Sequence, residues 1–105
     1  MNSEVELRMN QTLQIMDMND PKTFSYIIPA IKLIKCEYVE KKDLEVAKSM
    51  LSFLNKLIKY IIEMSTNSEC ENRLVTESAF LVVQLVTCIY ESIRIFFVFN
   101  YRDFK

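Results

Sequence analysis

The stretch that decides the fold is Arg73–Arg102, RLVTESAFLVVQLVTCIYESIRIFFVFNYR. Most of its residues are large and apolar, and its polar residues recur at helical spacing along one line: Arg73, Glu77, Gln84, Thr87, Glu91, Arg94 and Arg102. A helix of this kind meets water along one narrow stripe only, so other helices or a partner must cover its remaining sides. The pattern predicts a long, mostly apolar helix over 72–99 that is central in a helical bundle.

Three shorter helices are predicted before it, over 3–18, 21–39 and 43–64. Between the first two, Asp20 is placed as the helix cap and Pro21 at the first helical position. Pro29 predicts a kink in the second helix, or two short helices that meet near Ile28, because proline removes a backbone donor and clashes with the preceding turn.

The helix predicted over 43–64 has the cleanest amphipathic pattern of the chain. Its predicted core side consists of Ala47, Met50, Leu51, Leu54, Leu57, Ile58 and Ile61. Its predicted polar side consists of Lys48, Ser52, Asn55, Lys59 and Glu63. Apolar residues three and four apart on one side are typical of a helix that packs on a core.

Length and composition limit the fold class. The chain has 105 residues, which predicts a single helical domain over 1–105. Glycine is absent, and both phosphate-binding loops and dinucleotide-binding fingerprints require it, while tight hairpin turns favour it. The expected fold is therefore all-α, a small four-helix bundle.

The composition also argues against an enzyme. Histidine, the commonest general base and metal ligand, is absent. The paired carboxylates of the chain are explained as surface residues, so no cofactor and no metal site are expected. The sequence shows no motif of a known family. We therefore expect a protein that is not an enzyme.

Charge and cysteine content bear on partners and location. The formal net charge is −1, and the basic residues between positions 32 and 59 are lysines without an arginine, which makes nucleic acid an unlikely partner. The three cysteines are widely spaced, with no CxxC pair. This pattern predicts reduced thiols and an intracellular protein, cytoplasmic or nuclear.

The main functional clue is a surplus of apolar side chains. Ile, Leu, Val, Phe and Met account for 42 of the 105 residues, more than the core of a small domain is expected to bury. We expect a non-enzymatic protein–protein interaction or scaffold module, which oligomerises or forms an obligate complex through its last helix. The expected contact residues lie where that helix outruns its neighbour: Ile89, Ile93, Phe96, Phe97, Phe99, Tyr101 and Phe104.

The alternative is a membrane-associated helical protein anchored by residues 79–104. A spanning helix needs about twenty mostly apolar residues, and this stretch is long enough. Gln84, Glu91 and Arg94 interrupt it on one side, and charged groups are costly in the hydrocarbon layer. The sequence therefore favours a buried or interface helix over a membrane anchor.

Overall fold

The computed structural model describes residues 4–41 and 44–103, and it describes the side chains of residues 4–40 and 44–98. Along the chain these residues form the helices α1 (Glu4–Asp17), η1 (Pro21–Tyr26), α2 (Ile27–Lys41), α3 (Leu44–Ser65) and α4 (Asn72–Asp103). No strand occurs within the described ranges. The prediction of an all-α four-helix bundle is confirmed.

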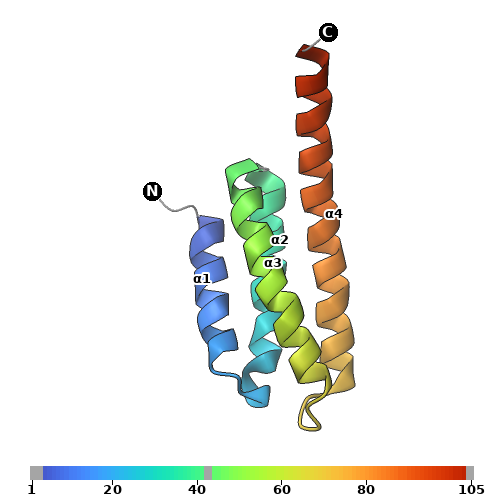
Figure 1. The fold of residues 1–105 in the computed structure, drawn as a ribbon. Coiled ribbons are helices and arrows are strands. Elements are labelled where there is room, and N and C mark those ends of the chain that lie inside the picture. Colours follow the sequence, from blue (N-terminus) through green and yellow to red (C-terminus); the bar gives the residue numbers. More distant parts are fainter. Residues whose placement is uncertain (1–3, 42–43, 104–105) are drawn as a thin grey trace.

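The helices lie side by side, with α1 and α4 on opposite flanks of the α2–α3 pair (Figure 1). The core between them contains the aromatic residues Phe24, Tyr38, Phe53 and Tyr60, with aliphatic residues from each of α1, α2, α3 and α4. Its most fully buried aliphatic residues are Val5, Ile27, Ile31, Ile34, Met50, Leu57, Met64 and Leu85.

The break between α1 and α2 follows from three adjacent residues. Asn19 has a φ of 51°, the left-handed conformation that ends many helices and that Asn tolerates better than most residues. The Asp20 side chain accepts a hydrogen bond from the backbone N–H of Lys22 at 2.9 Å, and Pro21 opens the 3₁₀ helix η1. The predicted cap and helix start are confirmed.

The second helical segment consists of two helices rather than one. The 3₁₀ helix η1 ends at Tyr26 and α2 starts at Ile27, close to the junction predicted near Ile28. Pro29 is the third residue of α2. Its missing N–H costs nothing there, because the first N–H groups of a helix have no acceptor within it.

Asn19 provides a test of the backbone at this break. We expect Asn19→Val to lower the free energy of unfolding by about 1–2 kcal/mol, because a β-branched residue is strained at positive φ. Asn19→Gly should leave it unchanged or raise it, since glycine accepts this conformation without strain. Urea unfolding followed by circular dichroism measures both, and equal stabilities of the Val and Gly variants would contradict the assigned backbone.

The last helix is longer than the sequence predicts and less central. It has 32 residues against 22 in α3, and its C-terminal part extends beyond the ends of α2 and α3 (Figure 1). Its main contacts are with α2 and α3, so within residues 4–41 and 44–103 no helix covers one long side of α4. The candidate functional site lies on that side of α4.

Candidate functional site

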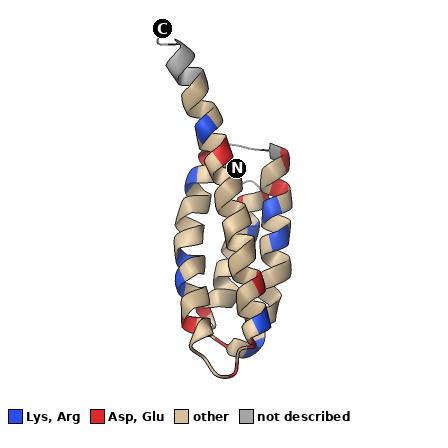
Figure 2. Ribbon diagram, turned by 90° about the vertical axis from the view of Figure 1, so that its right-hand side faces the viewer, with Lys and Arg blue, Asp and Glu red and all other residues tan. Residues whose placement is uncertain are grey.

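The outer side of α4 is exposed and apolar. Phe80, Val83, Val86 and Tyr90 lie at helical spacing along it, and all four are exposed. No charged residue occurs between Glu77 and Glu91. Figure 2 shows α4 in front of the bundle, with the uncharged turns in its middle. Single exposed apolar residues are ordinary on protein surfaces, whereas a continuous row of them indicates a contact region.

Helix α3 contributes a second exposed apolar row. Leu51, Ile58 and Ile62 are exposed, although the sequence pattern predicted Leu51 and Ile58 on the core side. That prediction is wrong for these two residues. The apolar side of α3 is wider than the surface that the neighbouring helices cover. Leu51 and Ile58 lie at the margin of this apolar side and remain exposed.

The row on α3 lies next to α4. The opposite edge of α3 faces α1, because Ser49, Ser52 and Lys56 line a hollow together with α1 residues. On α4, Glu77, Phe80 and Gln84 line a hollow with α2 residues, so the side that carries Val83 and Val86 points toward α3 and outward. Here "the apolar face" denotes the surface made of Leu51, Ile58, Ile62, Val83, Val86 and Tyr90.

The two rows overlap in height near Leu51 and Val86. Because α3 and α4 are antiparallel, a residue on α3 is level with one that lies equally far from the α3–α4 connection. Leu51 and Val86 each lie 14 residues from their end of that connection, Ser65 or Asn72. The apolar face is therefore one surface across two helices rather than two separate rows.

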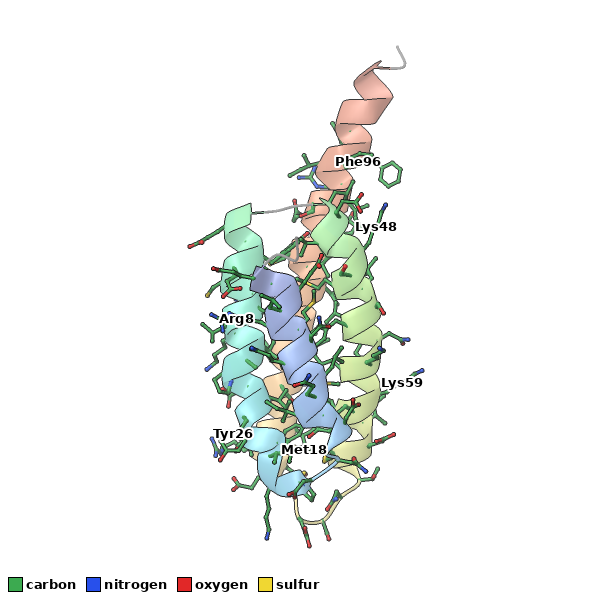
Figure 3. All side chains as sticks on the ribbon, turned by 90° about the vertical axis from the view of Figure 1, so that its left-hand side faces the viewer. Arg8, Met18, Tyr26, Lys48, Lys59 and Phe96 are labelled. Atoms are coloured by element: carbon green, nitrogen blue, oxygen red, sulfur yellow. The ribbon has the colours of Figure 1, made fainter. Side chains whose placement is uncertain are left out.

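The second feature is the overhang, which denotes α4 from Ile95 onward. Ile95, Phe96, Phe97 and Val98 are all exposed, and successive helical residues point about 100° apart. The helix is therefore apolar all the way round at this level. Phe96 and Phe97 contact each other edge to face, with ring centroids 5.8 Å apart, and Figure 3 shows Phe96 beyond the ends of α2 and α3.

The predicted contact residues fall into three groups. Phe96 and Phe97 are exposed on the overhang, as placed. Ile89 is 2% exposed and belongs to the core, and Ile93 is half-buried against the core, so Ile89 is not accessible to a partner in this fold. Phe99 and Tyr101 lie on α4, but their side chains are outside the described set, as is the whole of Phe104.

Two residues of the polar stripe of α4, Glu77 and Gln84, contact α2. Glu77 pairs with Lys32 at 3.4 Å, and Gln84 accepts a hydrogen bond from Lys35 at 2.7 Å. Further along, the Tyr38 hydroxyl donates to the Ser92 hydroxyl oxygen at 2.7 Å. These contacts occupy the α2 side of α4. The apolar face, on the α3 side, is the part that was missed from the sequence.

Several polar side chains away from α4 belong to the packing of the bundle itself. Arg8 of α1 pairs with Glu37 of α2, and Tyr60 stacks on Phe24 with ring centroids 5.7 Å apart. Burial raises the pKa of the Tyr60 hydroxyl, so it stays protonated at neutral pH.

The cysteines and acidic residues in the described part of the chain form no recognisable site. The three cysteines are free, and among the described residues no cluster of Cys, Asp and Glu could hold a metal ion. Cys70 is half-buried and donates to the Met64 sulfur at 3.4 Å. Burial raises the pKa of the Cys70 thiol, which lowers its thiolate content and hence its nucleophilicity.

Comparison with protein-family models, curated proteins and solved structures finds no match for this chain. Among the described residues, one helix is long and apolar enough to cross a membrane, over Asn72–Val98, and only 22% of its most apolar window is buried in the bundle. The core helix of a soluble protein is usually more buried than this. The exposed side of α4 is therefore the candidate functional site of this chain.

Proposed function

We propose that this chain is a non-enzymatic interaction module that oligomerises or forms an obligate complex through the exposed side of α4. The observation that carries the proposal is the apolar face together with the overhang. Tyr90 and Phe97 are 62% and 64% exposed, and large aromatic side chains are typical anchors of protein interfaces.

The exposed area is of the size that a specific interface uses. A fully buried aromatic ring removes about 150–250 Å² from water, so Tyr90 and Phe97 together offer roughly 200–300 Å². The five aliphatic residues of the apolar face are about half exposed, and each would add on the order of 50 Å² of apolar area. The sum is on the order of 500 Å², at the upper end of what a soluble monomer ordinarily exposes in one place.

Burial of this area would favour association. At ~25 cal/mol per Å², an apolar area on the order of 500 Å² on each partner contributes roughly 25 kcal/mol in total before the costs of association are subtracted. Those costs are large, and only the surplus appears as affinity. The area of the apolar face together with Phe97 therefore supports the proposal of a stable complex.

The test is the molar mass of the purified chain in solution. We expect a mass above the 12.5 kDa of the monomer at low micromolar concentration, by sedimentation or light scattering. The variant Val83→Gln/Tyr90→Gln should shift toward a folded monomer, whereas the control Lys56→Gln/Lys59→Gln on α3 should not. A wild-type chain that stays a well-folded monomer at every concentration would overturn the proposal.

Membrane association is the second candidate, and the length and hydropathy of α4, together with the overhang that is apolar all the way round, favour it. A lipid layer surrounds a helix on every side, as the overhang would require, whereas a partner helix covers one side. Flotation with phosphatidylcholine vesicles separates the two candidates. Co-flotation that is lost in Phe96→Ser/Phe97→Ser would support the membrane, and a chain that stays below the vesicles as an oligomer would support the interaction module.

A further inference from the structure

We infer that the partner of the exposed side of α4 is a second copy of this chain, packed antiparallel on a twofold axis at Tyr90. The inference rests on the proposed function and specifies its partner and geometry. The first observation that supports this inference is the spacing of the residues on the exposed side of α4. Taken in order from 83, the outer positions are Val83, Val86, Tyr90, Arg94 and Phe97.

This spacing is symmetric about Tyr90. The steps between consecutive positions are three, four, four and three residues, so the row has the same spacing in either direction from Tyr90. Two antiparallel helices centred there would place Tyr90 beside its own copy and Val83 opposite Phe97 of the second copy. A twofold dimer requires such a self-complementary surface.

Residue sizes favour the antiparallel arrangement. Val83, a small side chain, would face Phe97 of the second copy, and Val86 would face the long side chain of Arg94. Small residues opposite large ones let two helices interdigitate, and close packing is what interface cores share with protein interiors. In a parallel pair each position would meet itself, so two Phe97 rings would collide at one end while two valines would leave a gap at the other.

Charge favours the same arrangement. In a parallel pair, the two copies of Arg94 would lie against each other, and like charges in contact oppose association. In the antiparallel pair, Arg94 lies over Val86, where its methylene stem can cover apolar surface while the guanidinium remains in water. That guanidinium already pairs with Glu91 of its own helix at 2.9 Å.

In this dimer the overhang of each copy would contact the other copy. Phe97 of one copy would lie seven residues beyond the axis, over Val83 and hence over the apolar face of the other copy. Leu51 and Ile58 flank that position from α3, so the ring would have apolar residues from two helices around it. Both exposed features of the chain would thus be covered by one contact.

The area also fits a dimer. A stable interface buries about 800 Å² on each partner, and roughly 56–65% of that area is apolar. The apolar face with Phe97 offers on the order of 500 Å² per copy, which is close to that share.

Disulfide cross-linking of the full chain tests this geometry. In a background with Cys36→Ser, Cys70→Ser and Cys88→Ser, whose helix content is checked first, one protein carries Val83→Cys and a second carries Phe97→Cys. After mixing and mild oxidation, we expect a 83–97 cross-linked heterodimer at least tenfold above either homodimer. Disulfides need Cα atoms within about 7 Å, so they report which positions face each other.

A charge at the axis provides an independent measurement. Tyr90→Glu places two carboxylates side by side in the antiparallel dimer, and we expect its dissociation constant to rise at least thirtyfold. The control Ser52→Glu, on the α1 side of α3, should leave it within twofold of wild type. Both variants should keep the wild-type helix content, because Tyr90 and Ser52 are exposed.

Each other outcome is decisive. An oligomer that cross-links 83 to 83 and 97 to 97 would overturn the antiparallel geometry while leaving the proposed function intact. An oligomer that forms none of these cross-links and tolerates Tyr90→Glu would place the interface elsewhere and overturn both. A chain that stays monomeric would overturn the second copy as partner and the proposed function together.

Discussion

Leu54→Ala is expected to lower the free energy of unfolding by about 2–5 kcal/mol, the range for large-to-small changes in a packed core. Leu54 is 3% exposed on α3 and belongs to the central cluster with Leu57 and Leu85. Removing its side chain loses buried apolar area and leaves a cavity that the surrounding helices fill only in part. Small domains are marginally stable, so a loss of this size would unfold a large share of the molecules.

Leu51→Ala is the matched control for this prediction. It is the same substitution, one turn earlier on the same helix, at a residue that is 51% exposed. It should cost well under half as much in a monomeric state, because less area leaves the protein interior and no closed cavity forms. Urea unfolding at matched protein concentration gives both values, and equal effects would show that the phase of α3 about its axis is misassigned.

The comparison of Leu54→Ala with Leu51→Ala also tests the interface, because association adds to the apparent free energy of unfolding. If a second copy covers Leu51, its truncation weakens the dimer, and the loss grows with protein concentration as mass action requires. The effect of Leu54→Ala should instead be largely independent of concentration. The two leucines therefore separate the contribution of the core from that of the interface.

The ends of the helices could be predicted well because local chemistry determines them. Asp20 caps the segment that Pro21 opens, and the polar run from Thr66 to Glu71 forms the connection before α4. These signals act within a few residues and need no tertiary contact. The exception is the end of α4, which continues to Asp103 rather than stopping near 99.

The orientation of α4 could not be predicted in the same way. A helix that is apolar on nearly every side has no strong preference for which side it buries. Ile89 was assigned to the partner surface but is in the core, whereas Val83 and Tyr90 were not assigned to that surface and are exposed. The residue types of Ile89, Val83 and Tyr90 do not tell which of them is buried. Only the positions of α2 and α3 decide which side of α4 is covered.

The polar stripe of α4 can be recognised from the sequence, but the residues that it contacts cannot. Glu77 and Gln84 lie toward α2 because Lys32 and Lys35 are there to pair with them. These partners are 45 and 49 residues away along the chain, so helical periodicity detects the stripe but not what it faces. Had Lys32 and Lys35 been matched with Glu77 and Gln84, the side of α4 that faces α2 would have been known. The exposed side would then have been expected away from α2, toward α3 and outward.

The double substitution Phe96→Ala/Phe97→Ala is expected to weaken association by about 2 kcal/mol or more, roughly thirtyfold in the dissociation constant. Both rings lie on the overhang and are exposed, Phe96 by 44% and Phe97 by 64%. Truncation removes two aromatic anchors without opening a cavity, so helix content should stay near wild type. Sedimentation velocity over a range of concentrations measures the change.

Tyr26→Ala provides the control for the loss of an exposed ring. Tyr26 is 63% exposed, close to the 64% of Phe97, and it lies at the opposite end of the bundle from the overhang (Figure 3). If exposed aromatic area promoted association without regard to place, Tyr26→Ala and Phe97→Ala would weaken it alike. A specific interface on α4 requires that Tyr26→Ala leave the dissociation constant unchanged. An intact association constant with a lost fold in the Phe96→Ala/Phe97→Ala variant would show instead that these rings stabilise the bundle, and the interface would then have to be sought on α1 near Leu7.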